Sequence, residues 1–516
     1  MRYKGHSVLY KTMCGIYCVL RPTTDYCNEL RDLDHRGPYE SGVWSNDDIW
    51  MGHVRLPLVA PQNGSQPIQK DDWIIVINGE IYNSDAGKGL SDVYGFDPES
   101  PEKIDGVFAY VAYHKETKRV VVARDAFGVI PLYMCHYGGQ TYISSELKNL
   151  PPGAIMFPPG NKWICQNYVE QLQRFYYYDR VSKNMTNDLS QRVLELLTAA
   201  VRKRLQGDTP WAVMLSGGLD SSAVAAIASR LAVTERPDYP VTHSFCIGLK
   251  GSPDLKIARE VASYIGTRHH SVTVSLQDMM DAVKDCVRVV ETYDVTTIRA
   301  SVPMMLLSRV MRNYGIRFVL SGEGSDEIFA GYLYNYYCPN GKEMFDECIR
   351  KVKSLCWYDC LRANKSTMAY SVECRVPFLD KELVRFALFD MAPEEKIPTR
   401  ERPEKYHLRQ AVSKLLPSSV LNRRKAQFSD AVGSKWIQAL KQIRCEDFDK
   451  RHELFPHQTP DTHEAFYYRQ LFEEMYPGQE RACYYTGDST ACSSSTAFKW
   501  HSSFEKDPSG LSVSGI

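Results

Sequence analysis

The sequence has no long apolar run, no excess of either charge and no cysteines at metal-ligand spacing. Its 516 residues include no apolar stretch near the roughly 20 residues that span a bilayer, and no apolar segment that would form a signal peptide precedes Cys14. Lys plus Arg and Asp plus Glu each number 62, which argues against a nucleic-acid partner held by a bulk positive field. The 15 cysteines contain no CxxC pair, so we expect reduced, mostly buried thiols in a cytoplasmic protein rather than a zinc site.

What the sequence does contain is typical of a multidomain globular protein. Hydrophobic residues make up 44% and charged residues 24%, and the length suggests roughly two to four domains. Residues 13 to 150 carry short apolar strings, such as Trp73–Asn78 and Gly106–Tyr113, between turn residues. This pattern predicts an antiparallel β-sandwich. Residues 151–185, with two Pro-Pro-Gly stretches, are interpreted as a linker with a few strands.

Beyond this linker the pattern changes to alternating strands and helices. Apolar positions from Leu189 to Val201 recur at three- and four-residue steps, so a helix is expected to begin near Thr186–Asp188. From about 210 to 330 the alternation predicts a parallel α/β sheet, and residues 345–450 are expected to be helical. The Ser-, Thr- and Gly-rich end is interpreted as a mobile tail. We therefore predict domains over 14–185 and 186–477, and a tail over 478–516.

The strongest local motif is the loop Ser216-Gly217-Gly218-Leu219-Asp220-Ser221-Ser222, which follows an expected strand and opens an expected helix. Its glycines let backbone N–H groups approach an anion, and the hydroxyls and the helix N-terminus add donors and partial positive charge. Asp220 has no role in binding a bare anion, but it makes sense if a divalent cation accompanies phosphates. The alternative is a Gly/Ser turn without a ligand. The loop differs from the GxxxxGK[ST] phosphate loop, which the sequence lacks.

A second, acidic loop supports a phosphate and metal site. Ser321-Gly322-Glu323-Gly324-Ser325-Asp326-Glu327 follows the apolar string Ile316–Leu320 and places three acids within five positions. Such carboxylates repel one another unless a cation or a cationic side chain lies between them. Taken alone, the loop could also be an exposed acidic turn.

The N-terminal region offers a candidate nucleophile in Met13-Cys14-Gly15-Ile16. A cysteine on a strand is usually a small buried hydrophobe. If Met13 is removed, however, the free α-amine of Cys14 can act as general base for its own thiol. The following segments hold Arg36, Arg55 and Asn78-Gly79, which offer guanidinium groups for a carboxylate and donors for an oxyanion. Individually, Arg55 could be a surface ion pair and Asn78-Gly79 a hairpin turn.

Together these motifs resemble a class II glutamine amidotransferase domain, an α+β N-terminal-nucleophile sandwich of antiparallel sheets. It is joined to an α/β parallel-sheet synthetase domain of the PP-loop ATP pyrophosphatases. The arrangement is most similar to the glutamine-hydrolysing asparagine synthetases, especially those of type B. The resemblance runs from Met13 to about Pro477, and its most specific stretches are Asn78–Asn83, Leu215–Ser222, Glu291–Ser301, Leu320–Glu327, Val376–Asp380 and Asn422–Gly433.

The resemblance implies roles for particular residues of the N-terminal site. Cys14 would be the glutaminase nucleophile, with Asn78 and the Gly79 N–H as the oxyanion hole. Glutamine would be bound by Arg55, Leu56, Pro57, Leu58, Val59, Asn78, Gly79, Glu80 and Asp92.

For the second domain the resemblance implies an ATP site, an aspartate site and a Mg²⁺ site. Glu323 would assist formation of the β-aspartyl-AMP intermediate, and Lys425 would stabilise charge as pyrophosphate leaves. Asp220 and Asp326 would hold the metal, and Thr296, Thr297 and Arg299 the aspartate and pyrophosphate. The ATP site would consist of Leu215, Ser216, Gly217, Gly218, Asp220, Ser221, Ser222, Ile247, Ser321 and Gly322.

The implied activity is the synthesis of asparagine from aspartate, glutamine and ATP, in a possible homodimer. Aspartate needs adenylation because its β-carboxylate is a poor electrophile, and the ammonia must arrive neutral, which a dry passage between the domains would ensure. Nucleic acid and membrane are not expected as partners.

The sequence departs from the family pattern in the N-terminal half, so alternatives remain. The segment between Asn83 and Gly106 is short, and it leaves Leu90-Ser91-Asp92 where the family has Gly-Ser-Asp. We therefore expect weak glutamine binding, and the main alternative is a synthetase that uses free ammonia because its glutaminase is weak or inactive. A β-lactam synthetase and an inert scaffold are further alternatives. Thr296-Thr297-Ile298-Arg299 argues against the first, and the intact Asp220, Glu323 and Lys425 argue against the second.

Overall fold

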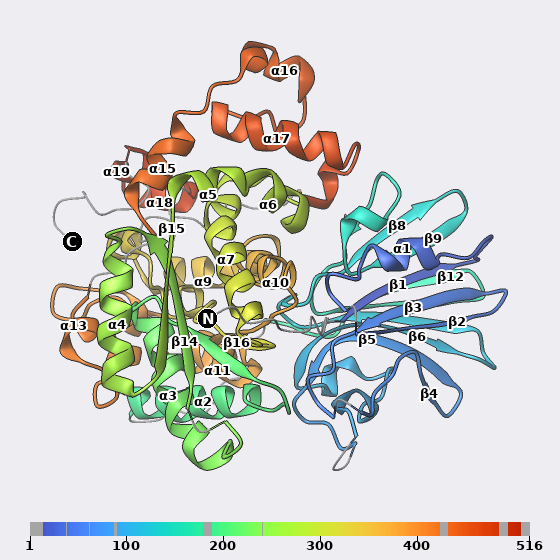
Figure 1. Cartoon of the computed structure of the whole chain (residues 1–516), viewed down its shortest axis with the longest axis horizontal. Coiled ribbons are helices and arrows are strands. Elements are labelled where there is room, and N and C mark those ends of the chain that lie inside the picture. The colour runs from blue at the N-terminus through green and yellow to red at the C-terminus, as the bar shows by residue number, and fades with distance from the viewer. Residues whose placement is uncertain are drawn as a thin grey trace, which may run out of the picture.

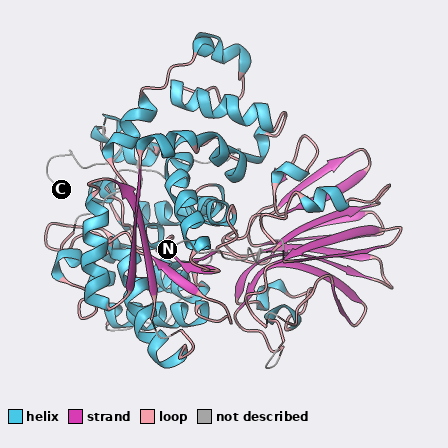
Figure 2. Cartoon of the chain, in the orientation of Figure 1, coloured by secondary structure: helices cyan, strands magenta, loops and turns pink. Residues whose placement is uncertain are grey.

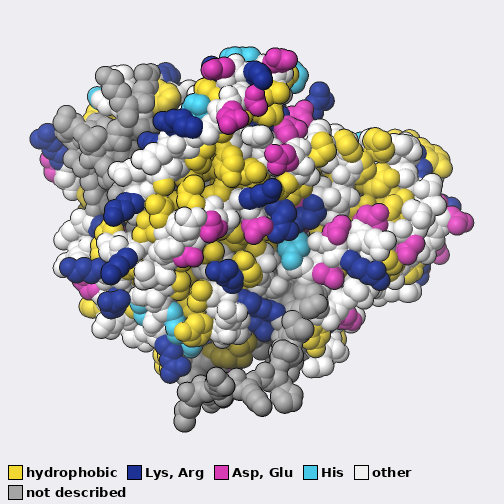
Figure 3. Space-filling view, turned by 45° about the horizontal axis from the view of Figure 1, so that its top comes forward, with side chains coloured by type: hydrophobic (Ala, Val, Ile, Leu, Met, Phe, Trp, Pro, Cys, Tyr) yellow, Lys and Arg dark blue, Asp and Glu magenta, His cyan; other side chains and the backbone are white. Residues whose placement is uncertain are grey.

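The protein folds into two regions that lie side by side (Figure 1). The N-terminal region is built of strands, whereas helices dominate the C-terminal region (Figure 2). Acidic and basic side chains are interspersed over the face drawn in Figure 3, in line with their equal numbers. The computed structural model describes residues 14–37, 39–60, 62–86, 90–178, 188–239, 241–423, 432–483 and 494–506.

The N-terminal region is a sandwich of two six-stranded antiparallel sheets, as the sequence predicts. The first sheet has the order β10-β8-β9-β1-β3-β2 and the second β12-β11-β7-β6-β5-β4. Helix α1 (Cys27–Arg31) packs against the first sheet. The strands are β1 (Gly15–Leu20), β2 (Glu40–Ser45), β3 (Ile49–Arg55), β4 (Ile68–Lys70), β5 (Trp73–Ile81), β6 (Gly106–His114), β7 (Arg119–Arg124), β8 (Tyr133–Tyr137), β9 (Gln140–Ser144), β10 (Ile155–Met156), β11 (Asn161–Gln166) and β12 (Val169–Arg174).

Strand β5 is buried on both faces, which explains its continuous apolar run. Alternate side chains point to opposite faces of a strand. Ile74 and Val76 therefore enter the core between the sheets, while Ile75 and Ile77 join a second apolar cluster on the outer face. The short segment before β6 covers that cluster with Val93, Phe96 and Ile104. This segment thus has a packing role, and it also carries Asp92.

Residues 151–185 contain the few strands that the sequence predicts, but these strands belong to the sandwich and are not part of a separate linker. Residues 161–174 form the β11–β12 hairpin, and β11 pairs with β7 from Lys162↔Ala123 to Cys165↔Val120. The hairpin therefore extends the second sheet of the sandwich. Its partner strand lies about 40 residues away in the sequence, so a local pattern did not reveal the pairing.

The C-terminal region contains the predicted parallel sheet, with the order β15-β14-β13-β16-β17. Its strands are β13 (Trp211–Met214), β14 (His243–Leu249), β15 (Arg268–Val274), β16 (Phe318–Leu320) and β17 (Glu373–Arg375). The larger helices are α2 (Leu189–Arg204), α3 (Leu219–Glu235), α4 (Pro253–Ile265), α6 (Val283–Val290), α7 (Val295–Asn313), α9 (Gly341–Ser354), α10 (Asp359–Met368), α15 (Ser434–Lys441) and α17 (His463–Met475). Shorter helices are α5 (Leu276–Asp281), α8 (Ser325–Ile328), α11 (Lys381–Arg385), α12 (Tyr406–Ala411), α13 (Ser418–Leu421) and α16 (Arg451–Leu454).

Local signals predicted some of these elements and missed others. Helix α2 begins after Asp188, whose carboxylate accepts a hydrogen bond from the Gln191 N–H, as expected of a helix N-cap. Strands β15 and β17 were not predicted. Strand β17 has only three residues and lies within a stretch expected to be helical.

The expectation of a mobile tail after residue 478 does not hold for residues 494–506. They form α18 (Ser495–Trp500) and α19 (Ser503–Lys506), and Ala497 and Phe504 pack against Leu333 and Tyr334. Aromatic residues within a polar stretch supply this contact. None of the helices in the described ranges combines the length and apolar character that a bilayer crossing needs.

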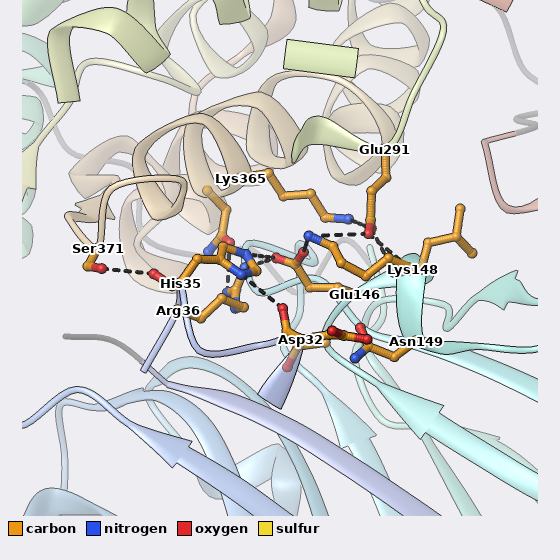
Figure 4. A network of polar contacts seen from close by, with 12 residues as sticks. Asp32, His35, Arg36, Glu146, Lys148, Asn149, Glu291, Lys365 and Ser371 are labelled. Atoms are coloured by element: carbon orange, nitrogen blue, oxygen red, sulfur yellow. Dashed lines mark hydrogen bonds and ion pairs between the residues drawn. The ribbon is translucent and has the colours of Figure 1, made fainter. Parts of the chain in front are cut away.

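Buried charged side chains join the two regions (Figure 4). Glu291, at the end of α6, accepts hydrogen bonds from the backbone N–H groups of Leu147 and Lys148 in the sandwich, and it pairs with Lys365 of α10. Both members of the Glu291–Lys365 pair are fully buried. Two charges without access to water are tolerated only while they remain paired.

We predict that Glu291→Gln destabilises the protein by about 3–5 kcal/mol, because it leaves the Lys365 ammonium buried without its counter-charge. Thermal or denaturant unfolding measures the change. The matched control is Asp285→Asn, since Asp285 belongs to an exposed ion pair with Arg288 and its loss should change stability by less than about 1 kcal/mol. Equal effects of the two substitutions would contradict the prediction.

Two candidate active sites

The first candidate site surrounds Cys14, immediately before β1. Strand β1 pairs with β3, with Gly15 opposite Val54, so Cys14 faces the residues that follow β3. Its Sγ atom lies 3.4 Å from the Leu56 N and 3.8 Å from the Leu56 O. Burial raises the pKa of the Cys14 thiol to about 12, and the Glu373 carboxylate also raises it. The thiol is therefore neutral at physiological pH, and a base must take its proton before it can act as a nucleophile.

Asn78 and Gly79 lie within β5 and do not form the hairpin turn that their sequence also allowed. The Asn78 side chain is buried, and its Nδ2 donates to the Ser145 Oγ over 3.4 Å. Gly79 has φ +139°, and a Cβ atom there would lie 2.0 Å from the Val107 O. Only glycine therefore fits at this position.

Arg55 is buried and is not a surface ion pair. Its guanidinium lies 3.2 Å from the Glu40 Oε2 and donates to the Ala60 and Asn63 carbonyl oxygens. Of the residues that follow it, Leu56, Pro57 and Leu58 are buried and Val59 is half-buried. Arg36, the other candidate guanidinium, donates to the Cys14 O over 3.1 Å and pairs with Glu146 over 2.7 Å.

Two carboxylates, the half-buried Asp92 and the buried Glu80, complete the first site. The Asp92 Oδ2 accepts a hydrogen bond from the Ile81 N–H over 2.6 Å. Glu80 lies on β5, and its Oε1 is 3.0 Å from the Arg375 Nη2 of the C-terminal region. Burial raises the pKa of both carboxyl groups. The segment before β6 thus holds Asp92 by a backbone hydrogen bond, although this segment is shorter than the family pattern.

The second candidate site is a cavity of about 210 Å³ at the carboxyl ends of the parallel strands. The loops after β13 and β16 both line it. In the sheet, β14 and β15 lie on one side of β13, and β16 and β17 lie on the other side, so the strand order changes direction at this point. This is the place where open α/β sheets bind ligands. The lining includes the predicted residues Leu215, Ser216, Gly218, Asp220, Ser221, Ile247, Thr296, Ser321, Gly322, Glu323 and Asp326.

The predicted phosphate loop lies at the N-terminus of the 17-residue helix α3. The Ser216 and Ser221 hydroxyl groups are 3.0 Å apart, and the Gly218 N–H donates to the Ser216 Oγ over 3.3 Å. Gly217 has φ +78°, and a Cβ there would be 2.7 Å from the Ile257 side chain. The loop therefore presents hydroxyl groups and the positive end of a helix dipole to the cavity.

The acidic loop packs directly on the phosphate loop. A Cβ at Gly322 would lie 2.8 Å from the Ser221 N and 2.9 Å from the Asp220 Cβ, so glycine permits the approach. The Ser325 hydroxyl donates to the Asp220 Oδ1 over 2.7 Å. Two motifs about 100 residues apart in the sequence thus form one site.

Lys405 lies between the two predicted metal ligands. Its Nζ is 2.6 Å from the Asp220 Oδ2 and 2.7 Å from the Asp326 Oδ1. An ammonium group at this point shows that the two carboxylates form a place for a cation, and carboxylate oxygens are suitable Mg²⁺ ligands. Among the described residues, no group of three or more His, Cys, Asp or Glu side chains is arranged to hold a metal. A metal here would need further oxygen ligands from a bound phosphate.

Arg362 of α10 forms the cationic counterpart of Glu323. Its guanidinium lies 2.7 Å from the Glu323 Oε2 and 2.8 Å from the Asp359 Oδ1. Nearby, burial together with the neighbouring Asp359 and Asp326 carboxylates raises the pKa of Glu327 to about 8. The cavity therefore combines acidic and basic groups within hydrogen-bonding distance.

Several predicted residues lie elsewhere. Thr297 lies in the first turn of α7, where its N–H donates to the Asp294 carboxylate. Arg299 pairs with Glu464 of α17 over 2.6 Å. Gly217 supports the loop, Ser222 is buried within α3, and Lys425 lies outside the described residues. Sequence reasoning missed Lys405, Arg362 and Asp359, because they lie on helices or at their ends and belong to no recognisable loop motif.

Comparisons with known proteins find relatives that match both regions of the chain. A family model described as asparagine synthase matches residues 192–346 and 337–502, and two models of glutamine amidotransferase domains match 13–88 and 88–152. The chain is 40% identical to asparagine synthetase B (glutamine-hydrolysing) of Escherichia coli, covering 97% of this chain and 99% of that one. It is 41% identical to glutamine-hydrolysing asparagine synthetases of Arabidopsis thaliana, over 98% of this chain and 94% of the relative, and of Zea mays, over 97% and 93%.

The raised pKa of Cys14 predicts slow alkylation in a chain that retains Met13. The rate of reaction with iodoacetamide should rise about tenfold per pH unit from pH 7 to at least pH 10, because only the thiolate reacts. Mass spectrometry of the Cys14 peptide measures it, with Cys14→Ser as the blank. A plateau below pH 9 would show that the thiol is not held neutral.

Proposed function

Because this chain belongs to the family of glutamine-hydrolysing asparagine synthetases, we propose that its two sites share one reaction. The C-terminal cavity converts L-aspartate and ATP into β-aspartyl-AMP and pyrophosphate. The site at Cys14 releases ammonia from L-glutamine, and ammonia displaces AMP to give L-asparagine. The carrying observation is the direct packing of the phosphate loop on the acidic loop around Asp220.

At the first site we assign Cys14 as the nucleophile that attacks the glutamine side-chain amide. Its neutral thiol requires a base, which the α-amine of Cys14 supplies once Met13 is removed. Asn78 and the Gly79 N–H would stabilise the oxyanion. Arg55 would bind the glutamine carboxylate, Glu80 and Asp92 its ammonium group, and the chain Leu56–Val59 the rest of the ligand.

At the second site the phosphate loop would receive the ATP phosphates, with Leu215 and Ile247 beside the nucleoside. The aspartate β-carboxylate attacks the α-phosphorus, and pyrophosphate leaves. Glu323 and Lys425 would act in this adenylation. Thr296 lines the cavity, and we infer that Arg362 on the same cavity binds a carboxylate of aspartate. The ion pair between Arg299 and Glu464 makes Arg299 a weaker candidate for that role.

A Mg²⁺ ion would be held by Asp220 and Asp326 and would neutralise charge on the departing pyrophosphate. The pairing of both carboxylates with the Lys405 ammonium supports this assignment. Homodimer formation rests on the family resemblance, and a cytoplasmic location rests on the expectation of reduced thiols. The ammonia-only alternative is not favoured, because both amidotransferase models match the N-terminal half.

We predict that Cys14→Ala abolishes asparagine synthesis from glutamine and leaves synthesis from ammonia within about twofold of the parent rate. The nucleophile serves only glutamine hydrolysis, so the adenylation cavity remains intact. Coupled assays of AMP and asparagine with each nitrogen source measure the difference. Cys27→Ala, at a half-buried cysteine on α1, is the matched control. Glutamate release by Cys14→Ala would refute the assignment.

We also predict that Glu323→Gln and Lys425→Ala suppress synthesis with either nitrogen source by roughly 100- to 1000-fold, equivalent to about 2.7–4 kcal/mol. Both groups would act before nitrogen attack, so glutaminase activity should persist. Aspartate-dependent exchange between ATP and pyrophosphate isolates the step. Glu382→Gln, at an exposed carboxylate of α11, provides the control. A parent rate with ammonia in either variant would remove that residue from the mechanism.

A further inference from the structure

Strand β17 of the C-terminal region projects two charged side chains toward the site at Cys14. Glu373 and Arg375 are two residues apart and therefore point to the same side of the strand. Arg375 lies 3.0 Å from the Glu80 Oε1, and its Nε donates to the Glu373 Oε1 over 2.6 Å. The charge of Glu373 also reaches Cys14, where it raises the pKa of the thiol. The first site is thus bordered by residues of the other region.

The guanidinium of Arg375 is fixed by contacts on several sides. It is 1% exposed, its Nη1 donates to the Arg204 and Gln206 carbonyl oxygens, and it stacks 4.1 Å above the Phe318 ring. Because these groups hold the cation in place, the position of the Glu80 carboxylate depends on it.

We propose that Arg375 is a positioning residue of the glutamine site, which holds the Glu80 carboxylate in the orientation that accepts the ammonium group of glutamine and favours its charged form. The N-terminal region therefore does not form a complete glutaminase site by itself, and β17 of the synthetase region completes it. This inference rests on the function proposed above, in which Glu80 binds glutamine.

Electrostatics in the buried site give Arg375 this role. Glu80 faces the carboxylates of Glu373 and Asp92, and burial and both neighbours disfavour its charge, while Arg375 favours it. Arg204, stacked 4.8 Å from the ring of Tyr82, is the further cation on this side, and Tyr82 and the Cys14 thiol are the other titratable groups that face the cluster. Without Arg375, three neighbouring carboxylates would share the site without a cation, and the pKa of Glu80 would rise further.

The strand that carries Arg375 also contacts the acidic loop of the C-terminal cavity. The Ser321 N–H donates to the Arg375 O over 2.9 Å. This hydrogen bond uses the backbone, so a substitution of the side chain leaves it in place. An effect of the side chain on glutamine can therefore be separated from an effect on the adenylation cavity.

The test compares Arg375→Met and Arg375→Lys in the full-length enzyme. We expect Arg375→Met to raise the KM for glutamine about tenfold or more, with kcat at saturating glutamine and the ammonia-dependent rate within about twofold of the parent. Arg375→Lys should restore part of the affinity, because it keeps the charge without the planar fork. Arg469→Lys, at another buried arginine with a carboxylate partner, is the control and should leave the KM unchanged. An unchanged KM, or a parallel fall of both activities, would overturn the proposal.

The pH profile gives a readout that a merely structural role would not change. Loss of the guanidinium raises the pKa of Glu80, so the acidic limb of kcat/KM for glutamine should move to higher pH in Arg375→Met. Glu373→Gln removes a neighbouring negative charge, and it should move the same limb to lower pH. This second variant tests the proposal even where Arg375→Met does not fold. Shifts in the same direction, or no shift in either variant, would overturn it.

Glu80→Gln separates this inference from the proposed function. If Glu80→Gln leaves the KM for glutamine unchanged, the assignment of the glutamine site fails and the proposal falls with it. If Glu80→Gln raises the KM and Arg375→Met does not, the site assignment holds and only the role of Arg375 is overturned.

Discussion

Buried charge at the contact between the two regions is the constraint on which the rest of the structure depends. Glu146 and Glu291 are almost fully buried. Glu146 pairs with Arg36 and with the nearby Lys148, and Glu291 pairs with Lys365 of α10. Figure 4 shows these side chains converging from the sandwich and from the helices opposite. The contacts that cross between the regions use the same charged groups: the Glu291 carboxylate accepts hydrogen bonds from the Leu147 and Lys148 N–H groups, and Arg36 donates to the Asn364 Oδ1. Because an unpartnered buried charge costs several kcal/mol, the two regions cannot slide past each other without breaking these hydrogen bonds. The electrostatics thus fix the position of one site relative to the other.

Two short elements turn this fixed contact into a link between the sites. Helix α10 presents Asn364 to Arg36, which holds the Cys14 carbonyl oxygen, and two residues earlier it presents Arg362 to Glu323. Strand β17 does the same with Arg375, through its side chain on one side and its backbone on the other. Packed residues of α10 and β17 therefore lie between Cys14 and the C-terminal cavity. Because packed protein excludes water, ammonia that passed here would stay neutral and would not become a non-nucleophilic ammonium ion.

The parts of the site that could be predicted from the sequence are those with a local signature. The phosphate loop is recognisable by its glycines and hydroxyl groups between an expected strand and an expected helix. The acidic loop is recognisable because its carboxylates also follow an expected strand. Lys405 carries no such signal, because its partner Asp220 lies 185 residues away. The helical period could have predicted that Thr297 and Arg299 face away from the cavity. Helix α7 lines the cavity with Thr296, Ala300, Met304 and Leu307, at steps of four, four and three residues, so the intervening positions face elsewhere.

The distribution of charge in the cavity explains why two loops are needed. The phosphate loop supplies donors and a helix N-terminus, which favour an anion. The acidic loop adds Asp326 to Asp220, and Lys405 pairs with both carboxylates. Carboxylates therefore lie beside the donors, at the point where a countercation of the nucleotide would lie. Lys405 reaches this position from a left-handed backbone conformation, with φ +58°, which a long side chain adopts at a cost of roughly 1–2 kcal/mol. Strain of this size persists only where surrounding contacts compensate for it, and the two short ion pairs of Lys405 provide that compensation.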